Sequence, residues 1–190
     1  MTTPVPAELD PTVSRWLTGF QDDIKTFLRV VYDDQELDDE LHAQATATVL
    51  YALAPGDVIP DSMGPLGYVD DALALRILVE ETRLRAPERF ATYGERMPEI
   101  IEPLADDIAI SKEWLGDLYE AFRARILQTD KIEYKGKRVR DTISDPEFLE
   151  DELSLATVKM DFKPTDVRSA IGKLATVPGI FRAKLTPKQR

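Results

Sequence analysis

The chain has 190 residues, of which 43% are hydrophobic and 31% charged, and its formal net charge is -11. This balance is typical of a folded globular domain and not of a disordered chain. Because the chain contains no cysteine, disulfides, thiolate catalysis and cysteine-ligated metal centres are excluded.

Apolar residues in the first half of the chain recur with helical spacing. A long amphipathic helix is predicted from Asp10-Pro11, interpreted as an N-cap and a first-turn proline, to about Val31. A second helix is expected to begin near Glu36, and a third near Tyr68 or the next residue. The apolar residues of these two helices cover more than one face, so we expect them to form the centre of a bundle.

The second half continues the helical pattern with one interruption. Apolar residues from Met97 to Ile108 predict a helix that kinks or restarts at Pro103, and Ser111 is expected to cap the helix that follows. Residues 131–139 alternate in polarity around a glycine, which predicts a short hairpin or turn.

Two further helices are predicted near the end of the chain. One opens at Asp145-Pro146, and the last begins at Pro164 and gives way to a tail after about Ala175. The sequence therefore predicts a single all-α, bundle-like domain of about six helices.

Charge is distributed unevenly along the chain. Residues 159–190 hold eight Lys or Arg against two Asp, whereas residues 1–158 hold 16 basic and 33 acidic residues. We expect an acidic body, 1–158, which would repel nucleic acid, and a basic C-terminal helix and tail, 159–190, packed on that body. No stretch approaches the ~18 apolar residues of a membrane span and no secretion signal is evident, so a cytoplasmic location is expected.

Carboxylates are the abundant reactive groups, since the one histidine, His42, has no serine near it in the sequence. Aspartate doublets are interpreted mostly as solvated helix faces, because neighbouring helical residues point about 100° apart. They occur at 22–23, 33–34, 38–39, 70–71 and 106–107. No catalytic residue is predicted.

The stretch from Tyr51 to Asp71 concentrates three prolines, three glycines and four aspartates in and around one loop. Turn and cap roles are the preferred interpretation of its aspartates, with Asp70 and Asp71 in the first turn of the third helix. A divalent-metal site is the alternative, and its candidate ligands are Asp57, Asp61, Asp70 and Asp71.

The same stretch resembles a known bacterial family. Its pattern is Y-x-L-x-P-x-D-x-I-P-D, followed by G-Y-x-D-D and an apolar helix, and it is similar to the signature of the YkvA-like domains of unknown function. The residues that carry this motif are Tyr51, Pro55, Asp57, Pro60, Asp61, Gly67, Asp70 and Asp71. The resemblance covers about residues 30–80 and implies a helical hairpin, at about 36–85, with a fixed loop. It implies no reaction.

A non-enzymatic interaction or regulatory protein without a cofactor is the function that these features favour, with another protein as its partner. Two alternatives stay open. One is a carboxylate-dependent divalent-metal hydrolase centred on the 55–71 loop, and the other is peripheral association with membrane or nucleic acid through the basic C-terminal segment.

Overall fold

Three long helices correspond to the first three apolar stripes. The computed structural model describes residues 5–52, 58–131, 133–142, 145–157 and 160–186. In it, α1 spans Leu9–Tyr32, α2 spans Asp39–Tyr51 and α3 spans Val69–Arg85. The Asp38 carboxylate caps α2 by accepting hydrogen bonds from the backbone N–H groups of Glu40 and Leu41.

The remaining elements are shorter. They are the 3-10 helix η1 (Asp61–Tyr68), α4 (Pro87–Tyr93), α5 (Pro98–Ile101), α6 (Leu104–Leu115), α7 (Asp117–Ile126), η2 (Thr129–Lys131), β1 (Glu133–Tyr134), β2 (Lys137–Arg138), α8 (Val139–Thr142), α9 (Pro146–Thr157), α10 (Pro164–Ile171), η3 (Leu174–Thr176) and α11 (Val177–Leu185). Helices make up 77% of the structure, which confirms the predicted all-α class. The antiparallel pair β1–β2 falls inside the stretch predicted to form a hairpin or turn.

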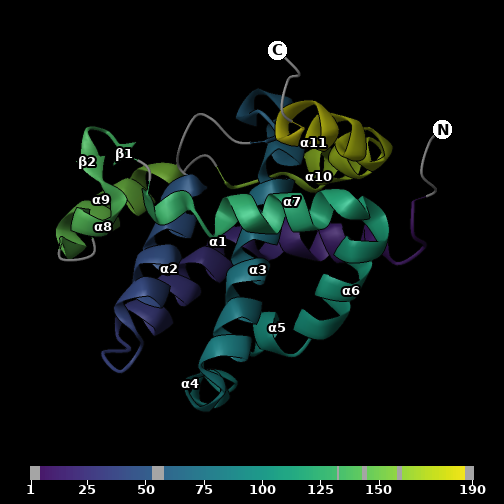
Figure 1. Ribbon diagram of the computed structural model, residues 1–190. Helices are drawn as coiled ribbons and strands as arrows, with labels where there is room; N and C mark the ends of the chain where they lie inside the picture. Colours follow the sequence, from purple (N-terminus) through teal and green to yellow (C-terminus); the bar gives the residue numbers. More distant parts are fainter. Residues whose placement is uncertain (1–4, 53–57, 132, 143–144, 158–159, 187–190) are drawn as a thin grey trace.

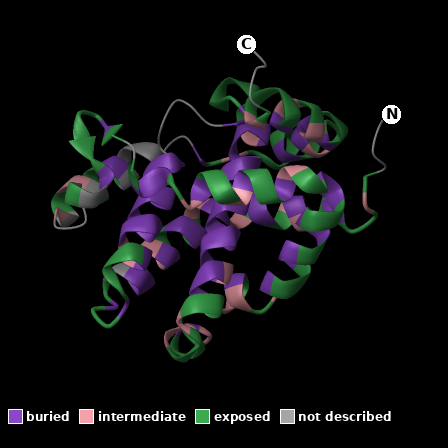
Figure 2. Cartoon of the chain, viewed as in Figure 1, coloured by how far each residue is buried: buried purple, intermediate pink, exposed green. Residues whose placement is uncertain are grey.

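Helices α2 and α3 form the centre of the bundle. They lie side by side, with α1 crossing both, α7 crossing α3, and α10–α11 covering one end (Figure 1). Figure 2 shows both helices buried over most of their surface, and in α3 the burial is continuous from Val69 to Val79. The central position of these two helices follows from apolar residues on more than one face.

Several helix ends differ from those predicted. Helix α1 begins at Leu9 after Glu8, so Asp10 lies in the first turn and is not the N-cap. Ser111 lies inside α6, where its hydroxyl donates to the carbonyl oxygen of Asp107 instead of capping a helix. The break comes at Gly116, whose φ of 54° suits a glycine. Pro103 does separate α5 from α6, as predicted.

Aromatic contacts hold the C-terminal helices to the rest of the structure. The Phe181 ring of α11 lies 5.0 Å from the Phe122 ring of α7, and the Phe162 ring lies 5.0 Å from the Tyr68 ring. The predicted tail after Ala175 is wrong, because α11 forms there with Pro178 in its first turn. The division of the chain into an acidic body and a basic C-terminal unit stays a prediction.

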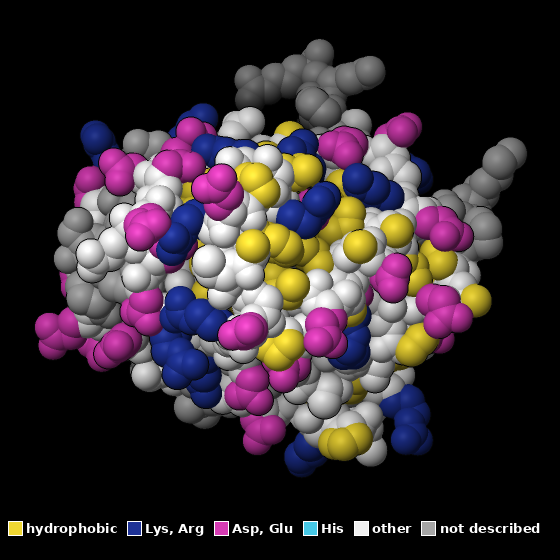
Figure 3. All heavy atoms as spheres, turned by 90° about the horizontal axis from the view of Figure 1, so that it is seen from below, with side chains coloured by type: hydrophobic (Ala, Val, Ile, Leu, Met, Phe, Trp, Pro, Cys, Tyr) yellow, Lys and Arg dark blue, Asp and Glu magenta, His cyan; other side chains and the backbone are white. Residues whose placement is uncertain are grey.

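Side chains of both charges are interspersed on the surface. In the view of Figure 3, acidic and basic side chains surround a central group of hydrophobic ones. Over the described ranges, every helix is too short or too polar to span a bilayer.

Candidate functional site

The motif residues bring the end of α2, the loop and the start of α3 together. Tyr51 is the last residue of α2, and Asp70 and Asp71 lie in the first turn of α3, as predicted. All three are buried. Pro55 and Asp57 lie outside the described residues.

Asp70 fixes the loop through one carboxylate oxygen. Its Oδ2 accepts hydrogen bonds from the Tyr51 hydroxyl at 2.9 Å, the Val58 N–H at 2.9 Å and the Ile59 N–H at 3.2 Å. The Val58 N–H also lies 3.1 Å from the Tyr51 hydroxyl oxygen. We call Tyr51, Val58, Ile59 and Asp70 the loop lock. The aspartate that accepts hydrogen bonds from the loop amides is therefore Asp70, in the first turn of α3.

Burial governs the protonation of Asp70. Its carboxyl group is fully buried, which raises its pKa to about 7, although the three donors to Oδ2 favour the charged form. Oδ1 has no hydrogen-bond partner within the described part of the chain. Since Oδ2 receives all three donors, Oδ1 carries the proton in the neutral form.

A close approach between two backbone segments explains why the motif has a glycine at position 67. A Cβ atom on this residue would lie 2.7 Å from the Cα of Asp61 and 2.8 Å from the carbonyl oxygen of Pro60. The backbones of Gly67 and Asp61 approach too closely for any larger residue at position 67. Pro60 and Asp61 are themselves exposed at the start of η1.

Among the described residues, the predicted metal ligands do not form a cluster. In the described ranges, no group of three or more Asp, Glu or His side chains lies close enough to hold a metal ion. Asp61 is exposed while Asp70 and Asp71 are buried. Asp57, the fourth candidate, is outside those ranges.

A buried arginine forms a second polar centre that the sequence analysis missed. Arg76 of α3 is fully buried, and its Nε and Nη2 donate to Asp107 Oδ2 and Asp23 Oδ2, each at 2.9 Å. Its Nη1 donates to the carbonyl oxygen of Ala72 at 3.0 Å. The guanidinium carbon also lies 4.9 Å from the centroid of the Trp16 ring, within cation–π range.

Asp107 collects further donors from α1. The Trp16 indole Nε1 donates to its Oδ2 at 2.9 Å, and Arg15 donates to its Oδ1. We call Arg15, Trp16, Asp23, Arg76 and Asp107 the arginine network. It joins α1, α3 and α6 through charge-assisted hydrogen bonds.

The aspartate doublets are thus not mainly solvated faces. In the doublets at 22–23, 33–34 and 106–107, the first aspartate is exposed and the second is buried. Asp34, for example, accepts from Arg89 Nε at 3.0 Å and from the hydroxyl of Tyr93. At 22–23 in α1 and 106–107 in α6, adjacent helical residues diverge by about 100°, so the second member faces inward, where Arg76 neutralises it.

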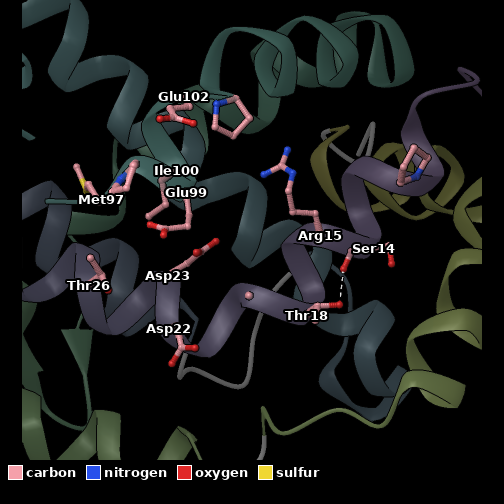
Figure 4. Close-up of a pocket in the computed structure, with 14 residues that line it drawn as sticks. Ser14, Arg15, Thr18, Asp22, Asp23, Thr26, Met97, Glu99, Ile100 and Glu102 are labelled. Carbon is pink, nitrogen blue, oxygen red and sulfur yellow. Dashed lines mark hydrogen bonds between the residues drawn. The ribbon is translucent and has the colours of Figure 1, made fainter. Parts of the chain in front are cut away.

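Asp23 connects the arginine network to an open groove of ≈ 1160 Å³. One wall is α1 and the other is the 97–103 segment, which includes α5 (Figure 4). The polar lining residues are Ser14, Arg15, Thr18, Asp22, Asp23, Thr26, Glu99 and Glu102, and the others are Pro11, Gly19, Met97, Pro98, Ile100 and Pro103. We call this cavity the α1–α5 groove.

Among the described residues, the groove has carboxylates but no assembled nucleophile and base. The Thr18 hydroxyl donates to the carbonyl oxygen of Ser14 at 2.7 Å, so it serves the helix. His42 lies elsewhere, with its Nε2 2.7 Å from the carbonyl oxygen of Val31. Burial raises the pKa of Asp23, while Arg76 opposes the shift and the charge of Glu99 adds to it.

Comparison with known proteins gives a short match. A domain family described as a protein of unknown function, DUF1232, matches residues 43–76, which include the whole loop lock and Arg76. Searches of curated proteins and of solved structures found no significant similarity. The segment from α2 to α3 is therefore similar to a domain of unknown function, as the loop motif indicated.

Proposed function

We propose that this chain is a non-enzymatic, cytoplasmic interaction protein, and that the α1–α5 groove is where it contacts a protein partner. The observation that carries this proposal is the groove itself, a cavity of ≈ 1160 Å³ between two helical walls. It is larger than a pocket for a single small ligand needs to be.

The use of the motif residues supports the same proposal. Asp70 and Tyr51 bond to the loop backbone, and Gly67 permits a close backbone approach. These are structural roles. We propose that the hairpin is a YkvA-like domain acting as the rigid centre, and that the surrounding helices supply the binding surface.

A photo-crosslinking experiment tests the proposed function. A photoreactive amino acid placed at Thr26, in the groove, should trap one discrete protein in the native host at least tenfold more efficiently than the same amino acid at Ala124, which is exposed on α7. The trapped protein, once purified, should form a complex of defined stoichiometry with this chain in analytical ultracentrifugation.

Several results would count against it. Equal trapping at both positions, or no complex between the purified proteins, would contradict a binding role for the groove. Hydrolytic activity that depends on added magnesium or manganese would favour the metal alternative. Salt-sensitive binding to anionic vesicles or nucleic acid would favour the C-terminal alternative.

A further inference from the structure

Acidic side chains without ion-pair partners line the α1–α5 groove. Arg15 and Arg76 are already occupied by Asp23 and Asp107. Asp22, Glu99 and Glu102 form no ion pair with any described residue. The groove therefore has an excess of negative charge that its own arginines do not neutralise.

Asp23 offers an acceptor atom to the same groove. The residue is 8% exposed, and its Oδ2 is held by Arg76. Its Oδ1 receives no hydrogen bond from the described residues, and Asp23 is part of the groove lining. Figure 4 shows Asp23 and Glu99 facing each other from the two walls. Arg76 holds one oxygen of this carboxylate in place, and the other oxygen can accept a hydrogen bond from a ligand. Asp23 is therefore a preorganised acceptor.

Gly19 keeps this acceptor uncovered. It lies four residues before Asp23 in the middle of α1, where glycine is a poor helix former. A Cβ atom at position 19 would lie 3.5 Å from Asp23 Oδ1, which is ordinary van der Waals contact. A larger side chain therefore fits the backbone here but would cover the carboxylate.

Apolar residues complete the lining. Prolines 11, 98 and 103 lie among the carboxylates and are exposed or half-buried, whereas Met97 and Ile100 on the α5 wall are each only 1% exposed. A cationic side chain attached to an apolar neighbour would match this combination better than a free metal ion, which needs several converging oxygens.

We propose, building on the proposed function, that the α1–α5 groove binds a basic segment of the partner protein and seats one Arg or Lys side chain between Asp23 and Glu99. The cation donates hydrogen bonds to Asp23 Oδ1 and to the Glu99 carboxylate. Asp22 and Glu102 supply longer-range attraction, and prolines 11, 98 and 103 contact the neighbouring side chains of the segment.

Peptide selection followed by affinity measurement tests this inference. A random dodecapeptide phage library, selected against the immobilised full-length chain, should enrich peptides that carry Arg or Lys beside an apolar residue. A synthetic copy of one such peptide should lose at least tenfold in affinity when its arginine is replaced by neutral citrulline, or its lysine by norleucine.

Two variants of the chain separate the groove from diffuse attraction to an acidic protein. Gly19→Leu changes no charge but covers Asp23, and it should lower the affinity for the peptide at least tenfold. Asp22→Asn/Glu99→Gln/Glu102→Gln should do the same. The matched control Glu147→Gln/Glu150→Gln/Asp151→Asn removes three exposed carboxylates from α9 and should stay within about twofold of wild type.

Stability provides a check on Gly19. Gly19→Ala should raise the melting temperature by about 2–4 °C, because alanine is the better helix former, while weakening the peptide. Higher stability with unchanged affinity would show that position 19 does not guard a binding site.

Three outcomes would overturn the inference: no enriched peptides, full affinity in Gly19→Leu, or an equal loss in the α9 control. The proposed function is judged separately by the crosslink at Thr26. A partner trapped there without any basic contact segment would leave the proposed function standing and remove only the cationic ligand.

Discussion

Replacing Arg76 with methionine should lower the free energy of unfolding by about 3–5 kcal/mol, the range found when a buried ion pair loses one partner. Methionine fills much of the same volume but leaves Asp23 unpaired and Asp107 with only the partly exposed Arg15 as counter-ion. Since domains are stable by only about 5–15 kcal/mol, the variant should be close to unfolding at 37 °C. Urea denaturation followed by circular dichroism measures the change.

Two controls make the Arg76 result specific. Arg83→Met alters an exposed arginine of the same helix, which pairs with Glu80, and should change stability by less than about 1 kcal/mol. Adding Asp23→Asn and Asp107→Asn to Arg76→Met should recover part of the loss, because no buried charge then lacks a partner. A loss below about 1 kcal/mol in Arg76→Met alone would show that the arginine network is not buried as described.

Asp70→Ala should cost roughly 3 kcal/mol or more. It removes the acceptor for the Tyr51 hydroxyl and for the N–H groups of Val58 and Ile59, and each orphaned buried donor costs about 1–3 kcal/mol. At about pH 4, where Asp70 is protonated in the folded chain, Asp70→Asn keeps one carbonyl oxygen in place and should cost about 1 kcal/mol, so both variants are compared with wild type at this pH. Equal losses in the two variants would contradict the loop lock, and urea denaturation again distinguishes them.

The same residue gives a pH dependence with a defined sign. In the folded chain the pKa of Asp70 is about 7, against 3.8 for an ordinary aspartate, so the folded state keeps a proton that the unfolded state has released. The stability that this proton contributes is complete below about pH 4 and is lost as the pH rises to about 7. Relative to Asp70→Asn, wild type should therefore lose stability as the pH rises through this interval. Above about pH 7 the difference between the two proteins should stay constant. A difference independent of pH would show that Asp70 is ionised throughout.

The main helices could be predicted from the sequence, whereas some of their ends could not. The stripes in α1 and α3 locate those helices within a residue or two. Ser111 is misleading because a serine hydroxyl bonds a helix carbonyl four residues back as readily as it caps a helix. Tertiary contacts such as the one between Phe181 and Phe122 decide that the C-terminal residues continue as α11.

The candidate site was only partly accessible to sequence reasoning. Asp70 could be placed in the first turn of α3. Its hydrogen bonds with the N–H groups of Val58 and Ile59 could not be predicted, because they depend on the path of the loop between α2 and α3. Arg76 did leave a signal, because it is a lone charge within the apolar run from Ala72 to Val79. The carboxylates that pair with Arg76 left no such signal. Asp23 is 53 residues away, Asp107 is 31 away, and each follows an exposed aspartate.

The loop lock also bears on how such a segment can spread among proteins. Its hydrogen bonds join residues at most 19 positions apart, and all four members lie within residues 43–76. A gene fragment encoding this segment thus carries its own loop geometry into any new setting. Arg76, at its last position, depends on residues outside the segment, because a host chain must provide carboxylates for it or replace it. A new host protein can thus take up the hairpin when it supplies carboxylates for Arg76 or replaces that residue.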